Sequence, residues 1–179
     1  WGITLSADGL RAYATGVNDD AVSWYERNST TGALTYGGML KDGVNGVDGL
    51  NGAWNITISS DGQYAYVTAT VDNSVTWFTR DATTGALAYG GFLKQGVDGV
   101  DGLNTPYGVI ISPNGQHLYV STYSGNSVAW FTRDPVTGAL SYAASDANYT
   151  LTQADVGAVI TVTASYTDGG STAETVTSA

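Results

Sequence analysis

The sequence predicts an all-β protein in which three consecutive copies of a four-stranded antiparallel unit are followed by a further β segment. Three observations lead to this fold class: an ungapped 53-residue repeat, turn signals at fixed positions in each copy, and strands with apolar side chains on both faces. With 24 glycines, 12 tyrosines and 5 tryptophans, the composition is typical of many short strands joined by tight turns.

The repeat is evident from the sequence alone. A segment that begins at Trp1 recurs at Trp54 and again at Tyr107, each time 53 residues further along the chain. Between the first two copies, 31 of 53 positions are identical, which is far beyond chance. The copies are predicted to span residues 1–53, 54–106 and 107–143, so the repeat region covers 1–143 and a different β segment covers 144–179.

Each copy contains four predicted strands in a fixed order. In the first copy residues 2–7 form an apolar run, and the Asp8-Gly9 pair that follows predicts a type I′ hairpin turn. A second strand, a polar turn, a third strand, a Thr-Gly turn and a fourth strand with the pattern Ala-Leu-x-Tyr follow. Third strands are expected at residues 22–27, 75–80 and 128–133.

The third strand has large apolar side chains on both faces, with Val75 and Trp77 on one face and Phe78 on the other. A sheet exposed on one side would alternate apolar with polar residues. Two apolar faces indicate a sheet packed between two neighbours, and four strands in such a unit are typical of a β-propeller blade. Because a closed propeller has about four to eight blades, we expect further blades from outside this sequence.

A tryptophan and an arginine each recur at a fixed position of their own in every copy. Trp24, Trp77 and Trp130 are predicted to lie in the core between blades. Arg27, Arg80 and Arg133 are predicted to stabilise the blades through an ion pair or a contact to a carbonyl group, because a single active site would not need them in every copy.

Short segments of the second copy resemble a known repeat. Residues 66–69 read Tyr-Val-Thr-Ala and residues 73–75 read Asn-Ser-Val, which is similar to the YVTN type of β-propeller repeat. The Ser-x-Asp-Gly spacing and the Thr-x-Gly-Ala-Leu turn strengthen the resemblance, which covers residues 1–143. That family includes bacterial lactonase-like proteins and repeats of prokaryotic surface proteins, so the resemblance implies a fold and leaves the function open.

After Ala143 the repeat ends, and residues 148–179 resemble the last third of the Ig-like repeats in large bacterial surface adhesins. Leu-Thr-Gln-Ala-Asp-Val-Gly at 151–157 and Val-Thr-Ala-Ser-Tyr-Thr-Asp-Gly at 162–169 carry this match. Alternating side chains predict one strand ending near Tyr166 and a second from 172 to 178. Such a short segment makes only part of a β-sandwich, either because another chain adds strands by β-augmentation or because the sequence is truncated.

The composition excludes several function classes. A net charge of −10 argues against nucleic-acid binding, which requires a basic surface. No apolar run is long enough to span a membrane, and the absence of cysteine excludes disulfides and thiolate metal sites. The sequence begins at Trp1 without methionine, which predicts a processed or partial chain.

The strongest candidate site is the connector after the fourth strand, which is rich in Asp, Asn and Gly. In an antiparallel four-stranded blade this connector emerges at the same end as the turn between the second and third strands, and so beside Asp19, Asp20 and Asp72. Calcium binds six to eight oxygen ligands of these types, so calcium is the one cofactor considered. The predicted ligands are Asp42, Asn45, Asp48, Asp98 and Asp101. The alternative is that these side chains only hydrogen-bond the local backbone.

Aromatic residues and a single histidine are the other candidates. Trp1, Trp54 and Tyr107 open the innermost strands, where they could stack against a carbohydrate ligand. His117 has no visible catalytic partner and is predicted to be a structural surface residue.

These features favour a non-catalytic extracellular or cell-surface module, an adhesin or filament subunit that binds or self-assembles through blade surfaces and open strand edges. A homo-oligomer or filament is the expected partner arrangement. The alternative is part of a lactonase-type β-propeller hydrolase. That alternative requires acid, base or metal groups at the central channel, and the innermost strands at 2–6, 55–59 and 108–112 contain no Asp, Glu, His or Arg.

Overall fold

The structure of the protein is a computed structural model that describes residues 1–146, 163–167 and 173–177. The chain divides into two compact units, Trp1–Asn148 and Tyr149–Ala179. All elements of the described residues are β-strands, in three four-stranded antiparallel sheets and one two-stranded sheet, so the predicted all-β fold class is confirmed. These residues contain no helix with the length and apolar character needed to cross a membrane.

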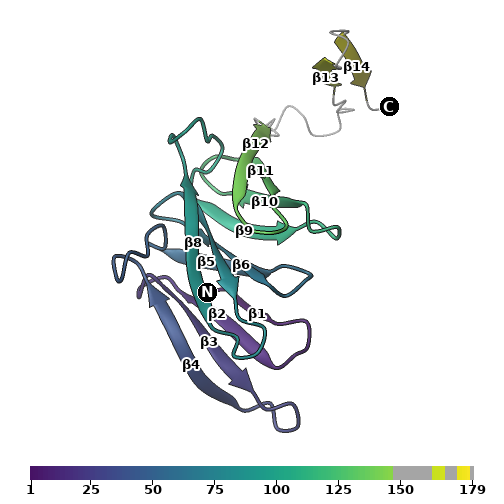
Figure 1. Cartoon of the computed structure of the whole chain (residues 1–179). Helices are drawn as coiled ribbons and strands as arrows, with labels where there is room; N and C mark the ends of the chain where they lie inside the picture. Colours follow the sequence, from purple (N-terminus) through teal and green to yellow (C-terminus); the bar gives the residue numbers. More distant parts are fainter. Residues whose placement is uncertain (147–162, 168–172, 178–179) are drawn as a thin grey trace, which may run out of the picture. The chain divides into compact units, whose positions relative to one another are not determined.

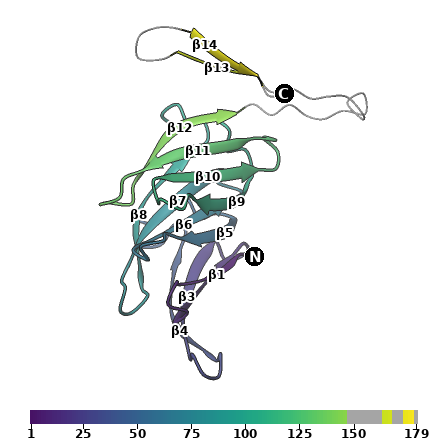
Figure 2. The same cartoon turned by 90° about the vertical axis from the view of Figure 1, so that its right-hand side faces the viewer.

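Each four-stranded sheet of the first unit is one copy of the repeat, with its strands hydrogen-bonded in chain order (Figure 1). The first blade consists of β1 (Ile3–Leu5), β2 (Arg11–Gly16), β3 (Ala21–Arg27) and β4 (Leu34–Lys41). The second consists of β5 (Ala53–Ile58), β6 (Tyr64–Ala69), β7 (Ser74–Arg80) and β8 (Leu87–Lys94). The third consists of β9 (Pro106–Ile111), β10 (His117–Thr122), β11 (Val128–Arg133) and β12 (Leu140–Asp146). The innermost strands β1, β5 and β9 lie next to one another, as expected for adjacent propeller blades (Figure 2).

The turn between the first two strands of a blade differs from the predicted type I′ form, which needs positive φ at both central residues. Gly9 has a φ of 68°, but Asp8 is not among the residues with positive φ. Instead, the Gly9 N–H donates to the Ser6 carbonyl at 2.8 Å, and Asp8 Oδ1 accepts from Ser6 Oγ at 2.6 Å and from Leu10 N at 2.9 Å. The aspartate closes the turn through its side chain, and only the glycine takes the left-handed conformation.

Two apolar cores lie between the blades, one on each side of the second blade. Phe78 belongs to the core shared with the first blade, and Val75 belongs to the core shared with the third. Both side chains are fully buried, and burial of this kind contributes about 2–3 kcal/mol for each. The prediction that the third strand is apolar on both faces because it lies between neighbours is therefore confirmed.

The predicted role of the three tryptophans is confirmed in two of the copies. Trp24 lies in the first core, and Trp77 packs against the second. Trp130 is half-buried and belongs to neither core, because the described residues place no blade against the far face of the third sheet. The same face leaves Tyr119 37% exposed, although Tyr66, its counterpart one repeat earlier, is fully buried.

All three recurring arginines donate to a carbonyl group of their own blade, as the repeat predicted, and Arg80 and Arg133 also contact the blade before it. Arg133 Nε donates to the Tyr66 hydroxyl at 2.7 Å, and that hydroxyl donates to the Gly138 carbonyl at 3.0 Å. Arg133 also donates to the Gly115 carbonyl at 2.9 Å and forms a 2.8 Å ion pair with Asp61. This one side chain thus joins a carbonyl of its own blade to a hydroxyl and a carboxylate of the blade before it.

In the second unit, β13 (Thr163–Thr167) and β14 (Ala173–Thr177) form an antiparallel pair. Two strands were predicted here; β14 lies within the predicted range 172–178, and β13 ends one residue beyond the predicted end at Tyr166. The remaining tail residues lie outside the described part of the chain, and the Ig-like character of this segment stays a prediction.

Candidate functional site at the connector face

The turns and connectors at one end of the blades form a continuous surface, which we name the connector face. It consists of the connectors 42–52 and 95–105 and of the turns 17–20, 70–73 and 123–127. The Asp42 N–H donates to the Asp20 carbonyl at 2.8 Å, and the Asp72 N–H donates to the Asn51 carbonyl at 3.1 Å. The prediction that each connector emerges beside the turn of strands two and three is therefore confirmed.

Four aromatic rings stack in a row across this face, and we call them the aromatic ladder. Trp1 and Trp54 have ring centroids 5.0 Å apart at an interplanar angle of 6°. The ring centroids of Trp54 and Tyr107 are 4.5 Å apart at an interplanar angle of 11°. Those of Tyr107 and Tyr123 are 5.4 Å apart at an angle of 20°. Trp1, Trp54 and Tyr107 were singled out from the sequence, whereas Tyr123 was missed because it lies in the turn before β11 and has no aromatic counterpart in the other copies.

Hydrogen bonds between blades hold the ladder in place. Thr15 Oγ1 of the first blade donates to the Trp54 carbonyl at 2.7 Å, and Thr68 Oγ1 of the second donates to the Tyr107 carbonyl at 3.0 Å. Trp54 and Tyr107 each have a ring stacked on both sides, so a ligand can meet only their edges. The open ring faces belong to Trp1 and Tyr123, which are 76% and 68% exposed. Any sugar stacking on this ladder would therefore use its ends.

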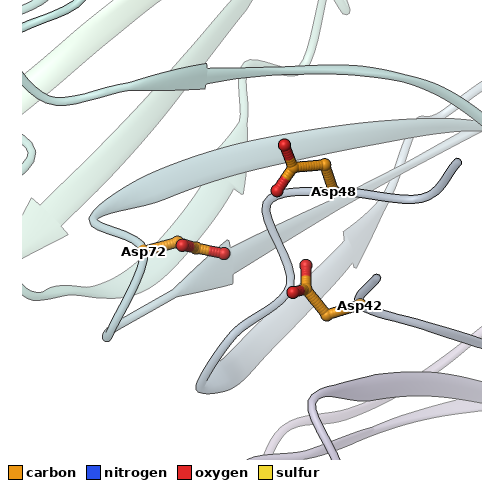
Figure 3. A group of neighbouring side chains, drawn as sticks. All are labelled: Asp42, Asp48 and Asp72. Carbon is orange, nitrogen blue, oxygen red and sulfur yellow. The ribbon is translucent and has the colours of Figure 1, made fainter. Parts of the chain in front are cut away.

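Three carboxylates meet where the first connector contacts the turn before β7. Ligand oxygens of Asp42, Asp48 and Asp72 lie within 4.8 Å of one another, and Figure 3 shows the three side chains pointing toward one another. Asp42 Oδ1 accepts from Leu50 N at 2.9 Å, and Asp72 Oδ2 accepts from Asn51 N at 2.9 Å. Their remaining oxygens are of the type that a calcium ion prefers.

The cluster contains two of the five predicted ligands and one residue outside that set. Asp42 and Asp48 come together as the calcium prediction requires, and Asp72 joins them from the turn. Asn45 and Asp98 are exposed at the tips of the two connectors, with φ of 53° and 50°, and neither belongs to the cluster. Asn and Asp tolerate this left-handed conformation well, which accounts for them at the tips without a metal.

The fifth predicted ligand, Asp101, has a different partner. Gln95 occupies the position equivalent to Asp42, and its Nε2 donates to Asp101 Oδ1 at 2.8 Å. Hydrogen bonds from this amide and from the Gly102 N–H lower the pKa of the Asp101 carboxyl. Because Gly125 stands where the first cluster has Asp72, the second connector brings only one carboxylate to this place.

A pocket of about 260 Å³ is lined by Asn55, Gly108, Ile110, Tyr119 and Val128 among others. Ile110, Tyr119 and Val128 lie on the face of the third blade that corresponds to a buried interface in the second. We therefore assign this pocket to blade–blade packing rather than to a ligand.

The family model described as Lactonase, 7-bladed beta-propeller matches residues 2–152. Among solved structures, a periplasmic gluconolactonase from Pseudomonas aeruginosa is 25% identical, with a TM-score of 0.69 over 81% of this chain and 39% of that one. A candidate 6-phosphogluconolactonase from Bacteroides fragilis is 28% identical, with a TM-score of 0.66 over 78% of this chain and 36% of that one. A second candidate 6-phosphogluconolactonase, from Bacteroides uniformis, is 20% identical and supports the fold alone, with a TM-score of 0.67 over 85% of this chain and 44% of that one. The chain thus spans less than half the length of these structures. None of the curated protein sequences compared with the chain matches it.

These comparisons overturn the predicted function. The prediction of a non-catalytic adhesive or filament-forming module is wrong, because the matching family is one of lactonases and the structures at 25% and 28% identity are described as a gluconolactonase and a candidate 6-phosphogluconolactonase. Acidity, the absence of cysteine, repetition and the open strand edges of the tail led to that prediction, yet none of these features distinguishes an adhesive module from part of an enzymatic propeller. Oligomerisation, carbohydrate binding and an extracellular or cell-surface location stay predictions.

Proposed function

Because the chain belongs to the lactonase family of seven-bladed β-propellers, we propose that it supplies three blades of a hydrolase that opens the ring of a sugar lactone. The family match over residues 2–152, which includes all three blades, is the observation that carries this proposal. Similarity to a gluconolactonase at 25% identity over 81% of the chain supports it.

The proposed reaction is ester hydrolysis within a ring. A water oxygen adds to the lactone carbonyl carbon, the bond from that carbon to the ring oxygen breaks, and the ring oxygen takes up a proton. The product is an open-chain hydroxy acid. The step needs a base for the water and hydrogen-bond donors for the carbonyl oxygen.

We assign the mouth of the substrate site, rather than its catalytic base, to these three blades. Their innermost strands contain no Asp, Glu, His or Arg, so a base at the channel would come from other blades of the ring. The connector face has groups suited to holding a sugar. The outer ring face of Tyr123 is open, and the Thr105 and Ser124 hydroxyls lie beside it, 2.9 Å from each other. Aromatic faces with a few polar groups are typical of small-molecule sites.

A kinetic assay of the full-length gene product tests the proposal. Hydrolysis of glucono-1,5-lactone is followed in a pH-stat against the uncatalysed rate, and we expect a saturable acceleration with kcat of about 1–10³ s⁻¹. A rate equal to that of buffer at all enzyme concentrations would overturn the proposal.

A pair of tyrosine variants tests the proposed mouth. Tyr123→Ser is expected to raise KM about fivefold and leave kcat nearly unchanged, because it removes one aromatic contact to the bound sugar. Tyr36→Ser is the matched control, since Tyr36 is 58% exposed but lies on the outermost strand β4. Equal KM values for both variants would exclude Tyr123 from the site.

We also propose that residues 148–179 derive from an Ig-like repeat. The support is the sequence element at 162–169 together with the β13–β14 pair. A structure of the full-length gene product tests this, because a complete sandwich would pair these two strands with others.

A further inference from the structure

We propose that the lactone accepted by this propeller is uncharged, and that the connector face disfavours a phosphorylated sugar lactone. This inference rests on the proposed lactonase function and adds the class of substrate. The similar structures differ on this point, since one is described as a gluconolactonase and others as candidate 6-phosphogluconolactonases.

The connector face is strongly acidic. It carries seven aspartates but, at its border, only two lysines, the last residues of β4 and β8. Lys94 Nζ lies 3.3 Å from Asp72 Oδ1, so the positive charge of one of the two lysines is already paired with an aspartate. Lys41 directly precedes Asp42 in the chain. The aspartates are Asp19, Asp20, Asp42, Asp48, Asp72, Asp98 and Asp101.

All four arginines lie at the opposite ends of their strands, and their guanidinium groups are already bound to the protein. Arg27 donates to the Gly9 carbonyl at 3.1 Å. Arg11 donates to two carbonyls in the turn between β7 and β8. Arg80 and Arg133 are buried between blades. Arginine is the residue best suited to a phosphate, because its fork of donors matches the phosphate oxygens. In the described blades these forks bind carbonyl, hydroxyl and carboxylate groups of the protein instead.

The same face suits an uncharged sugar. Carboxylates accept hydrogen bonds from sugar hydroxyls, and the end of the aromatic ladder at Tyr123 offers an open ring face. A phosphate dianion gains nothing from the ring and is repelled by the aspartates. At about 15 Å in water and low salt, each aspartate lowers the encounter with a dianion about twofold, so several together give tenfold or more.

A substrate comparison tests the inference. kcat/KM of the full-length gene product is measured with glucono-1,5-lactone and with its 6-phosphate, at about 0.01 M and 0.5 M NaCl, with EDTA present so that no divalent cation offsets the carboxylates. We expect at least a tenfold preference for the uncharged lactone at low salt, falling to a fewfold at high salt. A preference for the phosphorylated lactone would overturn the inference and leave the lactonase function standing. Hydrolysis of neither lactone, with EDTA or without it, would overturn both.

A charge reversal at the connector face tests the physical cause. Asp19→Lys is expected to raise kcat/KM for the phosphorylated lactone about threefold at low salt, with little change for the uncharged one. Glu26→Lys is the matched control, because Glu26 is exposed in the same blade near the opposite end of β3, and neither substrate should respond to it. An equal response to both variants, or a preference that salt does not alter, would show that the face does not select by charge and would overturn the inference.

Discussion

The interface between the first and second blades and the one between the second and third use the same repeat positions but satisfy them differently. At the second interface, Arg133 Nη2 forms an ion pair with Asp61 at 2.8 Å. At the first interface, Arg80 Nη2 is buried and makes no hydrogen bond. Such an unsatisfied donor costs about 1–3 kcal/mol. Arg133 therefore stabilises the second interface more than Arg80, at the same repeat position, stabilises the first.

A second repeat position, Arg11 in the first copy and Tyr64 in the second, also makes the second interface the more rigid one. At the first interface Arg11 reaches the turn of the next blade, with Nη2 2.6 Å from the Thr83 carbonyl and Nε 3.0 Å from the Thr84 carbonyl. At the second interface Tyr64 makes the corresponding reach to the Val136 carbonyl, and the Arg133 guanidinium lies 4.7 Å from its ring centroid. The second interface thus has the buried, rigid ring of Tyr64 where the first has the long, half-exposed side chain of Arg11. The same repeat position therefore gives two contacts of unequal rigidity.

The largest expected difference concerns the glycines of these turns. Gly138 and Gly85 have similar φ of 72° and 76°, but an added Cβ would lie 2.1 Å from the Tyr64 ring at Gly138 and 2.7 Å from the Arg11 side chain at Gly85. We expect Gly138→Ala to destabilise by about 3–4 kcal/mol and Gly85→Ala by about 1–2 kcal/mol, because Arg11 can move aside and the ring cannot. Urea unfolding followed by tryptophan fluorescence measures both. Equal losses would mean that the two contacts are equally rigid.

The next difference concerns the arginines. Arg133→Met removes an ion pair, a hydroxyl contact and a carbonyl contact, and we expect a loss of about 2–3 kcal/mol of unfolding free energy. Arg80→Met also removes the unsatisfied Nη2, so its loss should be about 1 kcal/mol. Arg27→Met is the control, because Arg27 donates only within its own blade, and it should change stability by less than about 1 kcal/mol. A loss at Arg80 as large as that at Arg133 would contradict the comparison.

A smaller difference is expected from pH. Burial alone would raise the pKa of the Asp61 carboxyl, but hydrogen bonds from Ser59, Gln63 and Arg133 together hold that pKa below its usual value of 3.8. The pKa of the Asp8 carboxyl is also lowered, chiefly by the hydrogen bond from Ser6. A lowered pKa in the folded state stabilises the protein above about pH 4, and this stabilisation disappears as the pH falls through the folded-state pKa.

Asp61→Asn should therefore destabilise by about 1 kcal/mol at pH 7, a value kept modest because the Asp61 side chain is 35% exposed. The loss should begin to shrink near pH 3.8, where the carboxylate of the unfolded chain takes up its proton, and should disappear as the pH falls through the lower folded-state pKa. Asp8→Asn should lose less, because Asp8 makes no ion pair at its interface. Thermal unfolding between pH 2.5 and 7 measures both variants. A loss at Asp61 that is independent of pH would mean that the contribution is not ionic.

The repeat made most of the blade architecture predictable. Strand order, the two-sided third strand and the connector face all follow from residues that recur at one spacing, such as Trp24 and Trp77. The turn at Asp8 was predicted with the wrong geometry, because an aspartate before glycine fits both a type I′ turn and a side-chain-closed turn. Only the Ser6 hydroxyl, which bonds that aspartate, distinguishes them.

The candidate site was less predictable because it depends on positions where the copies differ. Asp72 completes the carboxylate cluster. The sequence placed it beside the connector but not among the predicted ligands, and its counterpart in the third copy is Gly125. The tyrosines that receive the arginines recur as Tyr13, Tyr66 and Tyr119, and that spacing was an available signal. Function was mispredicted because the innermost strands of these blades contain no Asp, Glu, His or Arg that would indicate catalysis.

The smallest expected effect concerns the calcium prediction, and the two connectors provide its control. Asp42→Gln gives the first connector the residue that the second has at Gln95. The glutamine can keep the bond to the Leu50 N–H, as Gln95 Oε1 keeps 2.6 Å to the Leu103 N–H, so stability without metal should change by less than about 0.5 kcal/mol.

If calcium binds the cluster at millimolar affinity, about 5 mM CaCl2 should stabilise the wild type by about 1 kcal/mol, or about 2–4 °C in Tm, relative to EDTA. Asp42→Gln should lose this response, because one of three carboxylates becomes an amide that can donate to Asp48. Gln95→Asp should not create a second response, because Gly125 supplies no carboxylate there. Differential scanning calorimetry of the three proteins decides the matter. A wild-type Tm that is the same in CaCl2 and EDTA would contradict calcium binding, and the acidic connector would then be a turn whose aspartates bond only the backbone.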